Sequence, residues 1–184
     1  ITKTGYSFKG WYDNSSYTGD PISSVLSTET GDKEFYARWD VNKYTITYVT
    51  NNGTINASNV TQYTYGVGAT LPTNVTKTGH TFAGWYTNDS YAGERMTSIS
   101  TTTTGDKTYY AKWNVNSYDV TLNTDSGTIN SGNIASYTYG VGATLPTDIS
   151  KTGYTFGGWY DNSSCSGSPV LSIALNAIDD KEFW

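Results

Sequence analysis

One sequence pattern occurs three times in the chain at a fixed spacing. Residues 77–86 read Lys-Thr-Gly-His-Thr-Phe-Ala-Gly-Trp-Tyr, and closely similar stretches occupy residues 3–12 and 151–160. The copies begin at positions 3, 77 and 151, so the period is 74 residues with no insertion or deletion. A fixed period of this size indicates an array of similar small units, and it restricts the fold more than any other feature.

The period divides the chain into one complete repeat and two partial repeats. Residues 1–39 match the C-terminal half of a repeat, residues 44–113 form a complete repeat, and residues 118–184 form a third repeat that lacks its last strand residues. Residues 40–43 and 114–117 are predicted to be short linkers, which restrict the angle between neighbouring repeats. We therefore expect a segment of a longer tandem array.

The composition predicts a mainly β protein. Thr, Ser, Asn, Tyr and Gly are frequent, and these residue types favour strands and turns over helices. Aromatic residues make up 15% of the chain, which argues against a disordered segment. The net charge of −5 gives no electrostatic basis for binding nucleic acid or anionic lipid. No apolar run is long enough to span a membrane, so we expect no membrane insertion of this segment.

Alternation of apolar and polar residues locates the strands of the complete repeat. Strands are expected at residues 44–48, 61–65, 80–86 and 107–113, with turns at the Gly-containing stretches between them. Residues 96–104 are compatible with either a short strand or a single helical turn.

The expected core consists of aromatic residues at repeated positions. Phe82 and Trp85 are three residues apart, so strict alternation would place them on opposite faces of a strand. A β-bulge at Ala83-Gly84 would bring both rings to one face. The predicted core residues of the three copies are Phe8, Trp11, Trp39, Phe82, Trp85, Trp113, Phe156 and Trp159.

The sequence contains no convincing catalytic or metal-binding motif. His80 is the single histidine, and tyrosine occupies the equivalent positions 6 and 154, so an aromatic packing role explains it better than catalysis. The acidic residues lie scattered in turns without the ligand spacing of a calcium loop. Cys165 stands alone, which excludes a disulfide framework. We expect no catalytic residue, no cofactor and no metal site.

Repeated tyrosines are the strongest candidates for contact with a ligand. Tyrosine follows the core tryptophan in each copy, and two further tyrosines share a strand face with Arg38 or Lys112. Exposed tyrosines are residues that stack on sugars or bind a protein partner. The alternative, which we favour, is that they form cross-strand pairs on a solvent-facing sheet. The candidates are Tyr12, Tyr86, Tyr160, Tyr36 and Tyr110.

These motifs together resemble a known family. The complete repeat opens with Tyr-Thr-Ile-Thr-Tyr, continues through Tyr-Gly-Val-Gly-Ala-Thr-Leu-Pro and Thr-Gly-His-Thr-Phe-Ala-Gly-Trp-Tyr, and closes with Tyr-Tyr-Ala-Lys-Trp. This pattern is similar to the Listeria–Bacteroides repeat, which is related to the B-repeats of internalins. The resemblance implies small β-grasp-like units with a mixed sheet and a short or absent helix, joined in an elongated array. The sequence departs from the family pattern at His80, where tyrosine is usual, and at residues 96–104, which are too Thr-rich for a convincing helix.

The resemblance also implies a role. The leading hypothesis is a non-enzymatic stalk or spacer that projects an adhesive or effector domain from a bacterial cell. The alternative is an adhesion module that binds host glycan or host protein through the repeated tyrosines. In both cases neighbouring repeats of the same chain are the immediate partners. The expected location is the extracellular face of the bacterial cell surface, with signal and anchor outside this segment.

Overall fold

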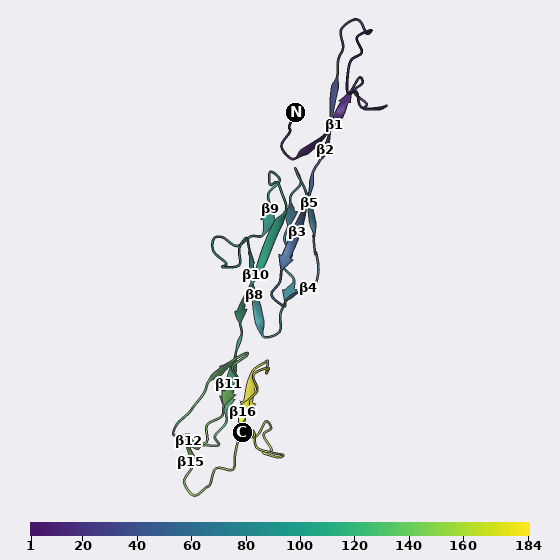
Figure 1. Cartoon of the computed structure of the whole chain (residues 1–184). Helices are drawn as coiled ribbons and strands as arrows, with labels where there is room; N and C mark the ends of the chain where they lie inside the picture. Colours follow the sequence, from purple (N-terminus) through teal and green to yellow (C-terminus); the bar gives the residue numbers. More distant parts are fainter. The chain divides into compact units, whose positions relative to one another are not determined.

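A computed structural model describes all 184 residues as strands, turns and extended segments, without any helix (Figure 1). The predicted mainly β fold is therefore confirmed. Contacts divide the chain into two compact units, residues 1–75 with 84–112 and residues 76–83 with 113–184, and we describe each by itself. The division passes through three strands of the complete repeat, so the compact units do not coincide with the sequence repeats.

The first unit begins with an antiparallel hairpin of β1 (Tyr6–Tyr12) and β2 (Tyr36–Val41), visible in Figure 1. Its register shifts between Phe8 and Gly10, at the position equivalent to Ala83-Gly84. Gly10 has a φ of 136° there, a conformation that favours glycine. The bulge brings the rings of Phe8 and Trp11 to a centroid separation of 5.7 Å, so both lie on one face, as the sequence predicted.

A four-stranded sheet organises the complete repeat. Its order is β5-β3-β10-β8, and β3 runs parallel to β10 although they are the first and last strands of the repeat. Antiparallel β5 lies on the other side of β3. The strands of the sheet are β3 (Lys43–Val49), β5 (Gln62–Thr64), β8 (His80–Tyr86) and β10 (Lys107–Val115).

Short strand pairs hold the segments between these strands. Within residues 96–104 the structure forms a strand rather than a helical turn, and this strand pairs with the segment just before Leu71. The segments between the main strands form two two-stranded sheets, β4-β7 and β6-β9. Their strands are β4 (Thr54–Ile55), β6 (Ala69–Thr70), β7 (Val75–Thr76) and β9 (Ser98–Ile99).

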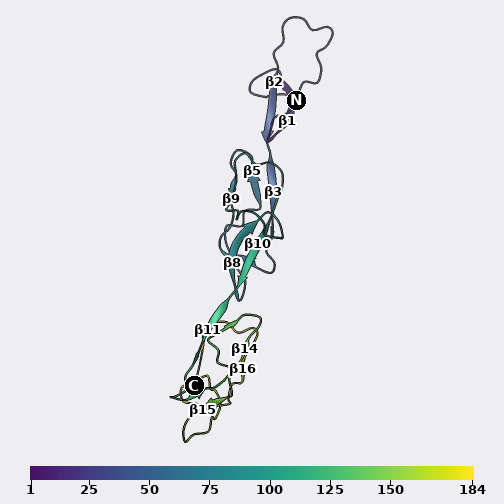
Figure 2. The same cartoon turned by 90° about the vertical axis from the view of Figure 1, so that its left-hand side faces the viewer.

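The second unit repeats this plan. A three-stranded sheet has the order β13-β11-β17, with β11 parallel to β17, and the pairs β12-β15 and β14-β16 accompany it. Strands β14 and β16 lie side by side in Figure 2. Residues 154–160, which correspond to β8, form no regular strand here. The strands are β11 (Ser117–Leu122), β12 (Thr128–Ile129), β13 (Ser136–Thr138), β14 (Ala143–Thr144), β15 (Ile149–Ser150), β16 (Ser172–Ile173) and β17 (Lys181–Phe183).

Each of the two larger repeats has its own core around a buried tryptophan. Trp85 and Trp159 are each 2% exposed, and their indole N–H groups donate to the carbonyl oxygens of Pro72 and Pro146 at 2.7 Å. In the second unit the buried cluster comprises Val120, Tyr137, Leu145, Trp159, Ile173 and Phe183. The equivalent buried residues of the complete repeat are Ile46, Tyr63, Leu71, Trp85, Ile99 and Tyr109.

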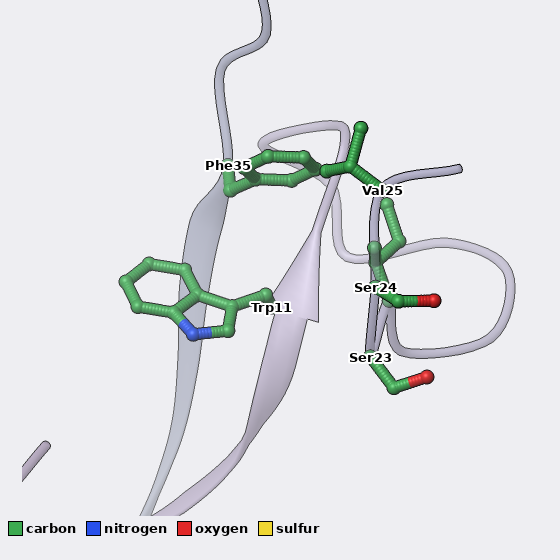
Figure 3. Close-up of a pocket in the computed structure, with 6 residues that line it drawn as sticks. Trp11, Ser23, Ser24, Val25 and Phe35 are labelled. Carbon is green, nitrogen blue, oxygen red and sulfur yellow. The ribbon is translucent and has the colours of Figure 1, made fainter. Parts of the chain in front are cut away.

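Three predicted core residues are not buried, and this part of the prediction is wrong. Phe8, Trp11 and Phe156 are 37%, 38% and 36% exposed. In residues 1–39 no strands cover the aromatic face of the hairpin, on which Figure 3 shows the Trp11 indole. Phe156 packs edge-on against the Trp159 ring, with centroids 5.4 Å apart, and the rest of its surface faces solvent. The remaining predicted core residues, Trp39, Phe82 and Trp113, are half-buried.

Truncating the central tryptophan should unfold the complete repeat. We expect Trp85→Ala to lower the free energy of unfolding by about 3–5 kcal/mol, because the substitution leaves a large cavity and an unpaired Pro72 carbonyl. Urea titration followed by hydrogen exchange of core amides measures this loss. Trp11→Ala, at the equivalent but exposed position, should cost clearly less. Equal losses for the two variants would contradict the core assignment.

Alkaline pH should destabilise the same core. Burial, with a smaller contribution from Tyr109, raises the pKa of Tyr48 to about 12, and burial also raises the pKa of Tyr109. An unfolded tyrosine ionises near about pH 10. The stability from the neutral Tyr48 is therefore complete below about pH 10 and decreases as the pH rises toward 12. Urea titrations at several alkaline pH values test this, and a flat profile would contradict it.

Candidate functional site

Titratable side chains do not gather into a reactive group. No cluster of three or more His, Cys, Asp or Glu residues has the geometry to hold a metal ion. His80 Nδ1 lies 2.8 Å from the Thr78 carbonyl oxygen, and its ring packs edge-on against Tyr139 with centroids 5.6 Å apart. The position of His80 therefore agrees with an aromatic packing role. Cys165 is exposed.

The structure removes one tyrosine from the set of candidate ligand contacts. Tyr12 is only 4% exposed, so its proposed role as an exposed contact is wrong. Its ring lies edge-on to Tyr17 at 5.8 Å, and the Arg38 guanidinium lies 5.9 Å from the ring centre. Local packing against the hairpin therefore covers this side chain. The sequence placed Tyr12 after the core tryptophan but could not show that the following turn folds back over it.

The other four candidate tyrosines are half-buried. Tyr86 lies edge-on to Tyr91 at 5.8 Å, and Lys112 Nζ lies 5.3 Å from the centre of the Tyr86 ring. The Tyr86 ring therefore already makes a cation–π contact within its own repeat. The backbone of Tyr160 exchanges two hydrogen bonds with Trp184. The binding role of Tyr36, Tyr86, Tyr110 and Tyr160 stays a prediction.

A second candidate site lies where one repeat follows another, and we call it the joint. At the first joint, Gly5 is buried with a φ of 77°, and the Tyr65 ring occupies the space that a Cβ at Gly5 would need. The Tyr6 ring meets the Tyr65 ring edge-on, with centroids 5.7 Å apart. Glycine is required at position 5 because the backbone there is in the left-handed region and because the Tyr65 ring leaves no space for a Cβ.

Asn42 connects the two sides of the first joint by hydrogen bonds. Its backbone N–H donates to the Gly5 carbonyl at 2.9 Å, and its own carbonyl accepts from the Tyr65 N–H at 3.0 Å. Its side-chain Oδ1 accepts from the Ser7 hydroxyl at 2.6 Å, and its Nδ2 lies 3.4 Å from the Tyr44 hydroxyl. One asparagine thus bonds to residues before and after it in the chain.

The second joint reproduces the first. The Asn116 N–H donates to the Gly79 carbonyl at 2.9 Å, and the Tyr139 N–H donates to the Asn116 carbonyl at 3.0 Å. Thr81 replaces serine as the donor to Asn116 Oδ1, at 2.7 Å. The Tyr139 ring again fills the space beside a buried glycine, Gly79, whose φ is 67°.

The third copy of the glycine and aromatic pair, Gly153 and Tyr154, is exposed. Gly153 has a φ of 80°, but a Cβ at this position would meet no neighbouring atom within 4 Å, and Tyr154 is 72% exposed.

The predicted linkers are shorter than expected. Strand β2 ends at Val41 and β3 begins at Lys43, so Asn42 alone lies outside the strands, and Asn116 alone separates β10 from β11. Sequence reasoning missed the joint, although one signal was present. Val-Asn occurs in both connecting segments, and Tyr-Gly-Val-Gly occurs in both following repeats, at the same spacing.

Comparison with known proteins gives one family and several relatives. A family model described as the Listeria-Bacteroides repeat domain matches residues 1–38, 44–112 and 118–173. A protein of Evansella cellulosilytica named "Putative membrane protein" is 35% identical over 87% of this chain, and one named "Putative Gly-rich membrane protein" is 31% identical over 88%. Internalin H of Listeria monocytogenes is 36% identical over 49% of the chain.

This chain spans only a part of those relatives, 23%, 18% and 16% of their respective lengths. No solved structure gives a significant match. The structure contains no helix with the length and apolar character needed to cross a membrane.

Two glycine substitutions test the contribution of the tyrosine ring at the second joint. Gly79→Ala should destabilise the second unit by more than Gly153→Ala, because only the Cβ at position 79 overlaps a tyrosine ring, while both positions have positive φ. The backbone cost common to both is about 1–2 kcal/mol, and the overlap adds about 1–3 kcal/mol. Urea unfolding of the two variants measures the difference. Equal effects would show that the ring contact contributes nothing.

Proposed function

The chain belongs to the Listeria-Bacteroides repeat family, and on that premise we propose that it is a non-enzymatic spacer built from tandem repeats in a bacterial surface protein. The spacer would project an adhesive or effector domain outward from the cell. The single observation that carries this proposal is the joint, because the same backbone and side-chain hydrogen bonds recur around Asn42 and Asn116. A connection whose hydrogen bonds recur at both joints favours a defined angle between neighbouring repeats.

The strand arrangement within the complete repeat supports this proposal. A mixed sheet in which the first strand lies parallel to the last, with no helix packed on it, fits a reduced β-grasp-like unit. A compact unit of this size has a diameter of about 30 Å, so each added repeat would lengthen an extended array by about that amount. We further propose that the repeats form such an array on the extracellular face of the envelope. The names of the two Evansella relatives and of internalin H agree with an envelope location.

Small-angle X-ray scattering on proteins with two, three and four complete repeats tests the spacer. We expect the maximum dimension to increase by about 30 Å for each repeat. Replacing each joint asparagine with glycine, at positions equivalent to Asn42 and Asn116, should reduce that increment because the side-chain bonds are lost and the backbone gains freedom. A maximum dimension that does not grow with repeat number would overturn the proposal.

The adhesive alternative has its own measurement. Glycan-array and host-protein binding should be negligible if the segment is a spacer. Binding that Tyr86→Ala or Tyr110→Ala abolishes, in a protein whose hydrogen-exchange pattern is unchanged, would require an adhesive role for the tyrosine face.

A further inference from the structure

Asn52 is the one asparagine of this chain that a glycine follows. It lies in the tight turn of residues 50–53, between β3 and β4, where Asn51 and Asn52 have φ values of 51° and 68°. The Gly53 N–H donates to the Thr50 carbonyl at 3.0 Å and closes the turn. Asparagine tolerates positive φ better than most residues, so this backbone favours an asparagine at position 52.

The side chain of Asn52 is free to react with the peptide bond that follows it. Asn52 is exposed, and its carboxamide forms no hydrogen bond. Asn51 differs, because its Nδ2 donates to the Tyr91 hydroxyl at 3.0 Å and to the Ala111 carbonyl at 3.3 Å. The Asn52 carboxamide can therefore rotate toward the Gly53 nitrogen, and glycine has no Cβ to obstruct that approach.

We propose that Asn52-Gly53 is a site of spontaneous covalent modification, at which the complete repeat converts its own turn into an isoaspartyl turn. The Gly53 nitrogen loses its proton to hydroxide and attacks Cγ of Asn52. The bond from the Gly53 nitrogen to Cγ forms, the bond from Cγ to Nδ2 breaks, and the side-chain nitrogen leaves as ammonia with a proton from water. Water then opens the resulting succinimide ring at either of its two carbonyl carbons, which leaves aspartate or isoaspartate at position 52.

The hydrogen bond that closes the turn controls this reaction. The Gly53 N–H is engaged with the Thr50 carbonyl, so that bond must open before the nitrogen attacks. A turn at the surface opens at a smaller cost in free energy than the strands of a core. The nitrogen also loses its proton more often as the pH rises. The reaction should therefore proceed in the folded chain, and faster at mildly alkaline pH than at neutral pH.

Isoaspartate would loosen one end of the parallel strand pair. The peptide bond then runs through the side-chain carboxyl, which lengthens the main chain of a tight turn by one carbon atom. Asn51 would move with the turn and lose its bonds to Tyr91 and Ala111. Ala111 follows Tyr110, the residue of β10 that pairs with Val49 at the end of β3. This inference does not depend on the proposed spacer function.

The second unit has the same turn without the reactive carboxamide. The Gly127 N–H donates to the Thr124 carbonyl at 2.9 Å, and the φ of Ser126 is 66°. Ser126 occupies the position that Asn52 has in the complete repeat. The chain therefore contains a matched turn in which a single substitution creates the proposed site.

The test incubates the full chain at neutral and at mildly alkaline pH and follows the mass of the peptide that contains residues 50–53. We expect this peptide to gain the mass of an amide-to-acid exchange, faster at the higher pH, and to become a substrate of protein isoaspartyl methyltransferase. Asn52→Ser should abolish the change, and Ser126→Asn should introduce it into the second turn. The isoaspartyl protein, separated by ion exchange, should unfold at a lower urea concentration than the unmodified protein.

The Asn52→Ser variant should keep the turn, because Ser126 adopts the same conformation. Conversion that occurs only in the urea-unfolded chain would overturn the proposal, since the folded turn would then protect the amide. Conversion of Asn51 at the same rate as Asn52 would also overturn it, because the hydrogen bonds of Asn51 would make no difference. Equal urea midpoints for the isoaspartyl and unmodified proteins would show that the modified turn does not loosen the strand pair.

Discussion

The hydrogen bond from the Trp85 indole to the Pro72 carbonyl joins the two halves of a repeat. The indole is 2% exposed, and leaving its buried N–H without an acceptor would cost about 1–3 kcal/mol. The acceptor comes from the first half of the repeat and the donor from the second. The same bond recurs between Trp159 and Pro146. In the partial repeat of residues 1–39, the equivalent Trp11 is 38% exposed.

The sequence predicted the strands well because their signals are local. Alternation located β3 and β8, and Gly84 marked a bulge that the structure shows at the equivalent Gly10. Alternation does not say which face another segment covers, and for that reason the predicted burial of Phe8 and Phe156 was wrong. Burial depends on residues far away in the chain, which the local pattern does not contain.

The candidate site illustrates the same limit. Gly5 and Tyr65 are 60 positions apart by their numbering, and neither is unusual in a chain rich in Gly and Tyr. Only the structure shows that the ring fills the space beside the glycine and that Asn42 bonds to both sides. Two of the tyrosines that stood out in the sequence have rings in contact with side chains of their own repeat, Tyr12 with Tyr17 and Tyr86 with Lys112. The repeated chemistry of this chain therefore lies in how its segments connect.

The parallel pairing of β3 with β10 has a mechanical consequence. The chain enters a repeat at the start of β3 and leaves at the end of β10, and parallel strands place these two points at opposite ends of the pair. Tension applied through the backbone would slide the two strands along each other. Their hydrogen bonds, from Lys107 opposite Ile46 to Tyr110 opposite Val49, would then resist together instead of opening one after another. The strand pair that closes each repeat is thus also oriented to withstand a pull along the chain.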